Sequence, residues 1–193
     1  MNIETTQERT IIEAIFLDRD GVIIHNRANY VRDISDVRFY PTSLLALRRL
    51  NQIPNPPKIY IVTNQSSIGR GILSFEKYNE ISQYIQKVIL SHGGKIEKIY
   101  FCPHAPFENC ECRKPKPGLI LEAIKKYNHN IHNTMLIGDA RSDIEAGYAA
   151  GIRNLYFVKT GRGNKQLPFI KELPYFDLVK IHKNFFEIVK TVF

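Results

Sequence analysis

The chain has 193 residues, of which 44% are hydrophobic and 24% are charged. This composition is typical of a folded protein with a buried core, and the length predicts one domain over residues 1–193. No apolar run approaches the ~18 residues of a membrane-spanning helix, and the polar start of the chain lacks the apolar centre of a signal peptide. We therefore predict a cytoplasmic protein with no membrane partner.

The net charge is +8, from 27 Lys and Arg against 19 Asp and Glu. Such a charge fits a nucleic-acid binder, an enzyme with an anionic substrate, or simply a basic surface. The basic residues are scattered along the chain and form no basic block, so charge alone does not choose between these classes.

Short apolar runs typical of strands alternate with segments of helical periodicity. Strands are expected at 14–18, 59–63, 98–102, 134–139 and 154–158, and helices at 41–51, 74–93, 117–128, 141–151 and, at the end of the chain, 181–193. Pro41 suits a first helical turn, Ser74 an N-cap and Gly151 a helix stop. Residues 55–57 and 159–168 are interpreted as connections. The alternation predicts a Rossmann-like α/β fold, a parallel sheet with helices on both faces.

Polar side chains follow three of the predicted strands: Asp18 and Asp20, Thr63 and Asn64, and Asp139 and Asp143. Ligands of open parallel sheets bind at the carboxyl ends of the strands, so we expect these side chains to lie together. Several carboxylates in one place need a cation, and oxygen ligands suit Mg²⁺. The alternative is that each Asp caps a helix or turn, which explains single positions, Asp143 above all, better than the set.

All three cysteines fall within eleven residues, at Cys102, Cys110 and Cys112, with His104 among them. An odd cysteine count in a cytosolic chain argues against a disulfide framework. These four side chains can fill a tetrahedral Zn²⁺ shell and leave no position for water. We therefore predict a structural zinc, which pins the loop before Arg113 and Lys114, rather than free thiols or redox chemistry.

Four ordered motifs resemble those of the haloacid dehalogenase superfamily: DRDG at 18–21, Thr63, KPKP at 114–117 and GDARSD at 138–143. TNQSSIGRG and the cysteine loop CPHAPFENCECRKPKPG narrow the similarity to the branch of heptose 1,7-bisphosphate 7-phosphatases and histidinol-phosphate phosphatases. The resemblance spans roughly residues 13–160. It implies a Mg²⁺-dependent phosphatase with a minimal cap, which removes the C7 phosphate of a heptose bisphosphate during nucleotide-activated heptose and lipopolysaccharide synthesis.

Carried over to this chain, the resemblance implies that Asp18 is the nucleophile and a Mg²⁺ ligand. Asp20 would be the general acid and base, and its backbone carbonyl would be a second metal ligand. Asp139 would complete the metal site. Thr63 and Lys114 would hold the reacting phosphate, and Arg113 would bind the second phosphate. Lys116 is the alternative candidate for the role of Lys114. The remaining implied substrate contacts are Arg19, Asn64, Gln65 and Ser66.

The sequence also departs from that branch. Ile24 stands where Asn is common, the loop after it is one residue longer, and Ala140 replaces a substrate-contacting lysine, for which Arg141 is a poor substitute. These changes leave substrate choice open between heptose bisphosphate and histidinol phosphate. TNQSSIGRG also resembles polynucleotide 3'-phosphatases, although the zinc loop and the missing kinase domain disfavour nucleic acid. A binding module that lost activity is disfavoured by the complete catalytic set. We expect a monomer that binds a phosphorylated sugar.

Overall fold

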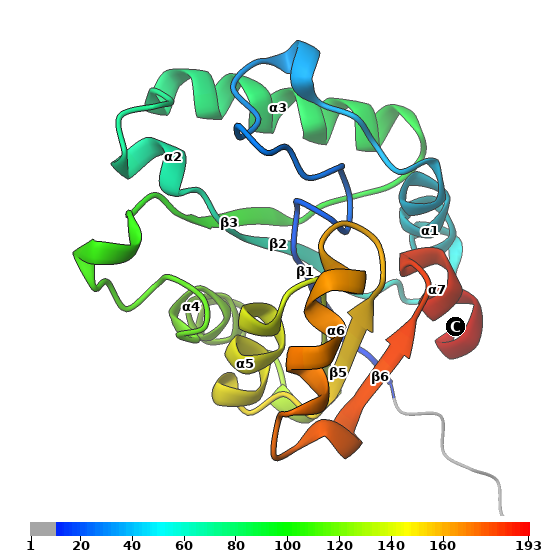
Figure 1. Ribbon diagram of the computed structural model, residues 1–193. Helices are drawn as coiled ribbons and strands as arrows, with labels where there is room; N and C mark the ends of the chain where they lie inside the picture. The colour runs from blue at the N-terminus through cyan, green and yellow to red at the C-terminus, as the bar shows by residue number, and fades with distance from the viewer. Residues whose placement is uncertain (1–10) are drawn as a thin grey trace, which may run out of the picture.

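The computed structural model describes residues 11–193, which form one six-stranded parallel sheet between two layers of helices (Figure 1). The polar residues 1–10, part of the segment in which we expect no signal peptide, lie outside the described residues. The strands are β1 (Ala14–Leu17), β2 (Lys58–Asn64), β3 (Lys98–Cys102), β4 (Thr134–Gly138), β5 (Asn154–Val158) and β6 (Val179–His182). The helices are α1 (Pro41–Gln52), α2 (Ser66–Gly69), α3 (Phe75–Ser91), α4 (Gly118–Tyr127), α5 (Arg141–Ala150), α6 (Gly163–Lys171) and α7 (Phe185–Val192).

The strand order is β3-β2-β1-β4-β5-β6, and the parallel sheet with helices on both faces confirms the predicted Rossmann-like α/β fold. Every residue of β1 and β4 is buried, as expected for central strands that are covered on both faces. The chain winds outward from β1 in one direction through β2 and β3, and then in the other through β4, β5 and β6. The order therefore reverses between β1 and β4, and a ligand crevice is expected at their carboxyl ends.

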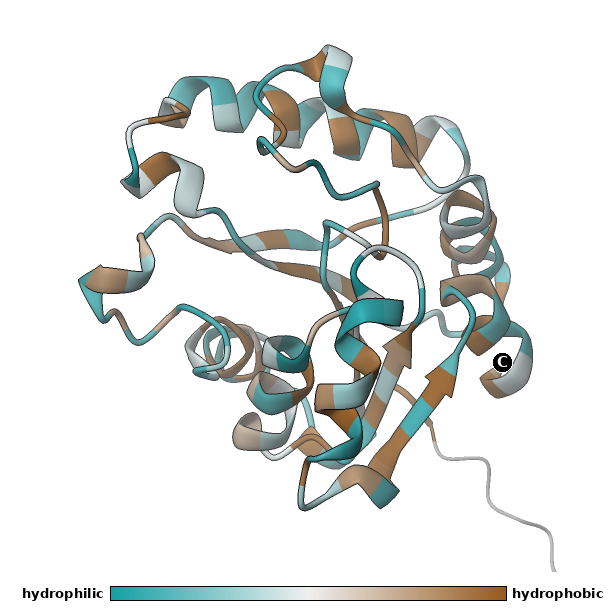
Figure 2. Ribbon diagram, viewed as in Figure 1, coloured by the Kyte–Doolittle hydropathy of each residue, from teal (hydrophilic) through white to brown (hydrophobic). Residues whose placement is uncertain are grey.

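Alternate residues of the strands pack into two separate cores. Ile15 and Leu17 of β1 face α1, α3 and α7, whereas Ala14 and Phe16 face α4, α5 and α6. Hydrophobic residues accordingly lie along the strands and on the helix sides that face the sheet, with hydrophilic residues outside (Figure 2). Each face of the sheet is thus covered by a buried apolar core, and the polar side chains at the strand ends lie at the carboxyl edge of the sheet.

Several predicted helix boundaries are confirmed by their capping geometry. Pro41 occupies the first turn of α1, and the Ser74 side chain accepts a hydrogen bond from the Lys77 backbone at the start of α3. Gly151 ends α5 in the left-handed conformation, with φ of 98°. Among residues 11–193, no helix combines the length and apolar character that a membrane span requires.

The region after β5 differs from the prediction. The sequence predicts a connection over residues 159–168, but α6 begins within this range, at Gly163. The structure also has a sixth strand, β6, which overlaps the start of the predicted helix 181–193. Two glycines and Pro168 made the segment resemble a turn, yet Pro168 is tolerated inside α6. The edge strand β6 is only four residues long, which leaves little alternation to detect.

Candidate active site

Asp18, Asp139 and Asp143 meet at the topological switch point, directly beyond the ends of β1 and β4. All three are buried, and each offers a carboxylate oxygen within 4.8 Å of the others. Asp139 is 0% exposed, and its Oδ1 has no hydrogen-bond partner among the described residues. An unpaired carboxylate oxygen away from water is costly unless a cation neutralises it. The donor set and its burial therefore fit a hard divalent cation such as Mg²⁺.

The crowding of these carboxylates changes their acidity. Burial, together with the neighbouring charges of Asp18 and Asp143, raises the pKa of Asp139 to about 8. The backbone N–H of Arg162 opposes this rise, because it donates a 2.7 Å hydrogen bond to Asp139 Oδ2. Without a cation, a proton on Asp139 thus replaces part of the charge that a metal would supply.

Lys114 is the cation that joins two of these carboxylates. Its ammonium lies 2.8 Å from Asp18 Oδ1 and 2.6 Å from Asp143 Oδ1, and it donates a third hydrogen bond to the Val62 carbonyl at 2.7 Å. Burial alone would lower the pKa of Lys114, but Asp143 and Asp18 raise it above its usual value. Lys116 instead pairs with Glu111 at the surface, and its side chain is 43% exposed. Only the first lysine of KPKP therefore enters the site.

Asp143 serves both as a helix cap and as a site residue. Its Oδ2 accepts a hydrogen bond from the Ala140 backbone in the first turn of α5, at 3.0 Å, while its Oδ1 pairs with Lys114. The interpretation of Asp143 as a helix cap is therefore compatible with its place in the carboxylate cluster, since each uses a different oxygen. Gly138 makes this approach possible, because a methyl group there would overlap the Asp143 side chain.

Asp20 lies outside the carboxylate cluster, in a network with Arg19 and Gln65. Arg19 donates to both Asp20 oxygens, at 3.0 and 3.2 Å, and to Gln65 Oε1 at 3.1 Å. The Gln65 amide in turn donates to Asp20 Oδ2 at 3.1 Å and to Thr63 Oγ1 at 2.9 Å. The Asp20 side chain keeps 21% of its surface exposed, so it is held in one orientation but can be reached from the cavity.

Asn64, expected to contact substrate, lines the cavity above the site and also holds the backbone of Lys114. Its Nδ2 donates to the Lys114 carbonyl at 3.0 Å, and its Oδ1 accepts from the Lys114 N–H at 3.1 Å. Both the donor and the acceptor of the Asn64 amide are thus bonded to a residue 50 positions further along the chain. Arg141, considered as a substitute for a lysine at Ala140, pairs with Glu145 at 2.7 Å on the outer side of α5.

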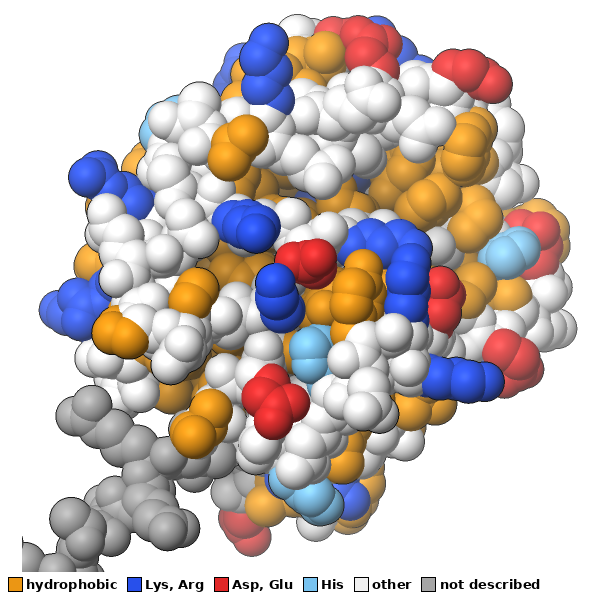
Figure 3. Space-filling view, turned by 180° about the vertical axis from the view of Figure 1, so that it is seen from behind, with side chains coloured by type: hydrophobic (Ala, Val, Ile, Leu, Met, Phe, Trp, Pro, Cys, Tyr) orange, Lys and Arg blue, Asp and Glu red, His pale blue; other side chains and the backbone are white. Residues whose placement is uncertain are grey.

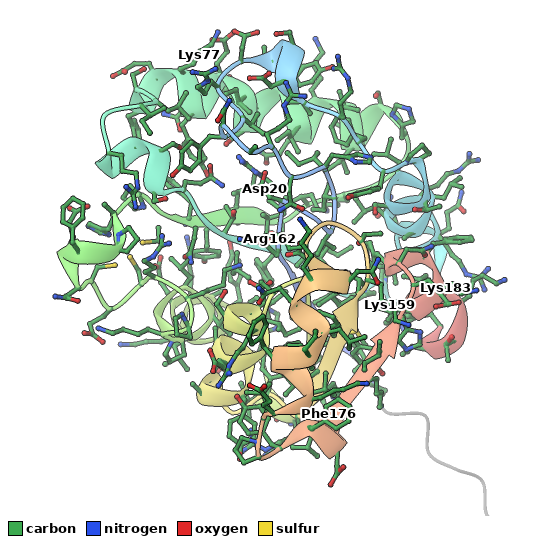
Figure 4. The ribbon with its side chains drawn as sticks, viewed as in Figure 1. Asp20, Lys77, Lys159, Arg162, Phe176 and Lys183 are labelled. Carbon is green, nitrogen blue, oxygen red and sulfur yellow. The ribbon has the colours of Figure 1, made fainter. Side chains whose placement is uncertain are left out.

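A cavity of about 430 Å³ opens above these residues. Asp20, Asn64, Gln65 and Ser66 line it, and its cations are Arg19, Arg27, Arg70, Arg113, Lys114 and Arg162. In Figure 4, Asp20 and Arg162 lie near the centre of the molecule, Asp20 in the turn after β1 and Arg162 in the loop before α6. Such a concentration of positive charge is suited to a ligand that carries several negative charges.

Sequence reasoning missed Arg27, Arg70, Arg162 and Asn26 as residues of this cavity. Arg162 follows the end of β5, a position where a site residue could have been expected from the parallel sheet. Asn26 and Arg27 come from the segment after Asp20, which carries no regular pattern. Arg70 ends α2, a helix of four residues that is too short to show periodicity.

The second predicted metal group lies beside the cavity, where β3 ends. The Cys102 sulfur lies 3.4 Å from that of Cys110 and 3.5 Å from His104 Nδ1, and the Cys112 sulfur lies 3.3 Å from the same nitrogen. Burial opposes ionisation of Cys110, but hydrogen bonds from Cys102 and Cys112 lower its pKa to about 7. Three sulfurs and one nitrogen at these separations fit a tetrahedral cation.

The fold and the carboxylate-lysine site define a phosphatase of the haloacid dehalogenase superfamily, and a family model described as HAD-hydrolase-like matches residues 111–174. The chain is 38% identical to a D-glycero-alpha-D-manno-heptose-1,7-bisphosphate 7-phosphatase of Photorhabdus laumondii, covering 78% of this chain and 84% of the relative. It is 39% identical to the corresponding beta-anomer enzyme of Helicobacter pylori, covering 75% and 82%. The chain therefore belongs to the D-glycero-D-manno-heptose-1,7-bisphosphate 7-phosphatase family.

A solved structure supports the same assignment. The D,D-heptose 1,7-bisphosphate phosphatase of B. bronchiseptica, in complex with magnesium and phosphate, superposes with a TM-score of 0.86 at 28% identity. The match covers 94% of this chain and 98% of that one.

Proposed function

We propose that this protein hydrolyses the C7 phosphate of D-glycero-D-manno-heptose 1,7-bisphosphate, with Asp18 as the nucleophile. The observation that carries the proposal is the buried Asp18–Lys114 contact of 2.8 Å beneath a cavity rich in cations. A carboxylate oxygen of Asp18 attacks the phosphorus atom, either Oδ2 or, once Lys114 turns to the phosphoryl group, Oδ1. In both cases the phosphorus–oxygen bond to the sugar breaks and an aspartyl phosphate forms. Water then cleaves that intermediate and releases phosphate.

Asp20 is the proposed general acid and base. A sugar alkoxide is a poor leaving group, so a proton from Asp20 must reach its oxygen as the bond breaks. The ionised Asp20 then removes a proton from the water that attacks the aspartyl phosphate. Arg19 and Gln65 support this role by fixing the carboxylate in one orientation beside the cavity. Thr63, which accepts a hydrogen bond from Gln65, has a hydroxyl proton left to donate to the phosphoryl group.

Asp18, Asp139 and the backbone carbonyl of Asp20 are the proposed Mg²⁺ ligands, with Asp143 close enough to support them. The cation would supply positive charge where the phosphoryl oxygens gather negative charge. Lys114 provides a second positive charge at the same place, and Asn64 is proposed to position Lys114 through the two hydrogen bonds to its backbone.

Arg70 and Arg113 support the choice of a bisphosphate. Among residues 11–193, neither forms an ion pair, although both line the cavity. Arg113 makes only a 3.4 Å contact to the His104 carbonyl. Unpaired guanidinium groups can each offer two parallel hydrogen bonds to a phosphate, so they are the proposed partners of the non-reacting C1 phosphate. Ser66, the first residue of α2, also lines the cavity and is a further proposed substrate contact.

Zinc is the proposed occupant of the Cys102, His104, Cys110 and Cys112 group. The filled shell points to a structural role, because no open position is left for a substrate or water. The bound ion would fix the loop that leads from β3 to Arg113 and Lys114, and thus place both cations of the substrate site.

Phosphate release from three substrates tests the proposed specificity: heptose 1,7-bisphosphate, histidinol phosphate and a 3'-phosphorylated oligonucleotide, each with Mg²⁺. We expect at least a hundredfold preference in kcat/KM for the heptose and no activity from Asp18→Asn. On the molecular face in Figure 3, seen from behind relative to Figure 1, basic side chains are scattered among acidic and uncharged ones. A preference for either competing substrate would overturn the substrate assignment but keep the chemistry.

A further inference from the structure

The loop between β5 and α6 packs directly on the turn that follows β1. Thr160 Oγ1 donates a 2.6 Å hydrogen bond to the Gly21 carbonyl, across 139 residues of sequence. The next residue, Gly161, donates its N–H to Tyr40 Oη at 3.1 Å. This loop carries none of the sequence motifs of the superfamily, yet it is fixed to the turn that contains Asp18 and Asp20.

The same loop also forms a hydrogen bond to one carboxylate oxygen of Asp139. The Arg162 N–H donates to Asp139 Oδ2 at 2.7 Å, while Oδ1 stays buried without a hydrogen-bond partner among the described residues. Because Asp139 is fully buried, its carboxylate cannot turn to water for a better partner. The hydrogen bond to Oδ2 therefore fixes the side chain so that Oδ1 remains available to a cation.

Two glycines make room for this arrangement. Gly21 and Gly161 both adopt left-handed backbone conformations, with φ of 97° and 60°. A methyl group on Gly161 would overlap Asp139 Oδ2, Asn26 Oδ1 and the Cα of Gly21, and one on Gly21 would overlap the Asp139 carboxylate. The space around Asp139 Oδ2 is thus closed from two sides by backbone, and any larger side chain would displace the carboxylate.

From these contacts we infer that Thr160, Gly161 and Arg162 form a positioning clamp for Asp139. The clamp sets the cation site through the Arg162 backbone N–H, the absence of a side chain at Gly161, and the Thr160 hydroxyl that holds the loop against Gly21. The inference rests on the proposed function in one respect, that Asp139 holds the cation. It adds a determinant of metal affinity outside the ligands themselves.

The test is Mg²⁺ binding to the full-length, zinc-loaded protein, measured by calorimetry without substrate. We expect Gly161→Ala to raise the dissociation constant at least tenfold. Gly71→Ala is the matched control, because Gly71 has a similar φ of 67° but nothing within 4 Å of an added methyl group. Gly71→Ala should strain the backbone to a similar degree but bring the added methyl group into contact with nothing, so its Mg²⁺ affinity should stay within twofold of wild type. Gly161→Ala with wild-type affinity, or a loss equal to that of Gly71→Ala, would overturn the clamp.

A second variant covers the case in which Gly161→Ala does not fold. Thr160→Val keeps the shape but loses the hydroxyl, and we expect Mg²⁺ affinity to fall about three- to tenfold. Thr191→Val is its control, since Thr191 also donates to a backbone carbonyl, at 2.8 Å, but in the terminal helix α7. Wild-type affinity in Thr160→Val would contradict the clamp. A wild-type protein that binds no Mg²⁺ would instead refute the proposed metal site.

Discussion

Lys114 and Asp143 form an ion pair of 2.6 Å between Nζ and Oδ1, and both side chains are only 3% exposed. The pair joins the KPKP loop to the first turn of α5, and Lys114 also reaches Asp18. One lysine therefore balances charge for two carboxylates that water cannot reach. We therefore expect Lys114 to be needed both for the stability of the folded protein and for the phosphatase reaction.

Lys114→Met should abolish phosphatase activity and destabilise the protein. Removal of one member of a buried ion pair leaves the other charge uncompensated and costs about 3–5 kcal/mol. Urea unfolding would measure the change in the free energy of unfolding. Lys116→Met is the control, because the surface pair of Lys116 with Glu111 should contribute less than about 1 kcal/mol. Equal stability of the two variants would contradict the role given to Lys114.

The metal-free protein should lose stability as the pH rises toward 8. The pKa of Asp139 is about 8 in the folded protein against an ordinary 3.8, so between these values the folded state binds more protons than the unfolded state. Under that condition the free energy of unfolding falls with increasing pH. Mg²⁺ should remove most of this slope, because the cation replaces the proton on the folded protein.

Urea midpoints between pH 5 and pH 8, in Mg²⁺-free buffer and with Mg²⁺, would measure both slopes. Asp139→Asn is the reference variant, since it cannot ionise and should show a flatter pH dependence without metal. A wild-type protein whose metal-free stability increases over this range would argue against the raised pKa of Asp139.

Loss of zinc should weaken both the fold and the substrate site. The free energy of a structural metal is folding free energy, so a zinc-selective chelator in excess Mg²⁺ should cost at least ~3 kcal/mol, or roughly 6–12 °C in Tm. The KM for the bisphosphate should rise as well, because the loop carries Arg113. Metal analysis should find one zinc per chain before treatment, and unchanged melting after verified zinc removal would defeat the proposal.

Arg70→Met and Arg113→Met should each impair recognition of the second phosphate. A charge-assisted hydrogen bond contributes about 1.5–3 kcal/mol, so we expect KM for the bisphosphate to rise roughly 10- to 100-fold. The KM for heptose 7-phosphate, which lacks the C1 phosphate, should change little. Arg153→Met, which removes a guanidinium stacked 4.4 Å from the Tyr148 ring, should affect neither substrate. Equal losses on both substrates would place these arginines at the reacting phosphate instead.

Much of the site could be predicted because its residues follow strands. Asp18, Thr63 and Asp139 lie at or directly beyond the carboxyl ends of β1, β2 and β4, where a parallel sheet brings side chains together. Their chemistry is also carried by side chains, which the sequence shows directly. The cysteine cluster was visible for the same reason, since spacing and residue type together indicate a metal shell.

Other parts of the site could not be predicted because they depend on backbone or on distant pairing. The shorter contact of Arg162 with Asp139 is made by its N–H, a group that every residue except proline carries, while its guanidinium lies 3.9 Å from the same oxygen. The bonds of Asn64 to the Lys114 backbone could not be predicted either, because they depend on a loop 50 residues away. The α6 helix was missed because Gly163 and Pro168 outweighed its apolar pattern.

The measurement that tests the proposed chemistry most directly is the identification of the phosphorylated residue. The enzyme would be quenched with acid during turnover of heptose 1,7-bisphosphate, and the peptide spanning Asp18 and Asp20 analysed by mass spectrometry. We predict one phosphoryl group on Asp18 in the wild-type protein, and neither phosphorylation nor turnover in Asp18→Asn. Turnover that persists in Asp18→Asn, or a phosphoryl group on another residue, would contradict the assignment of Asp18 as the nucleophile.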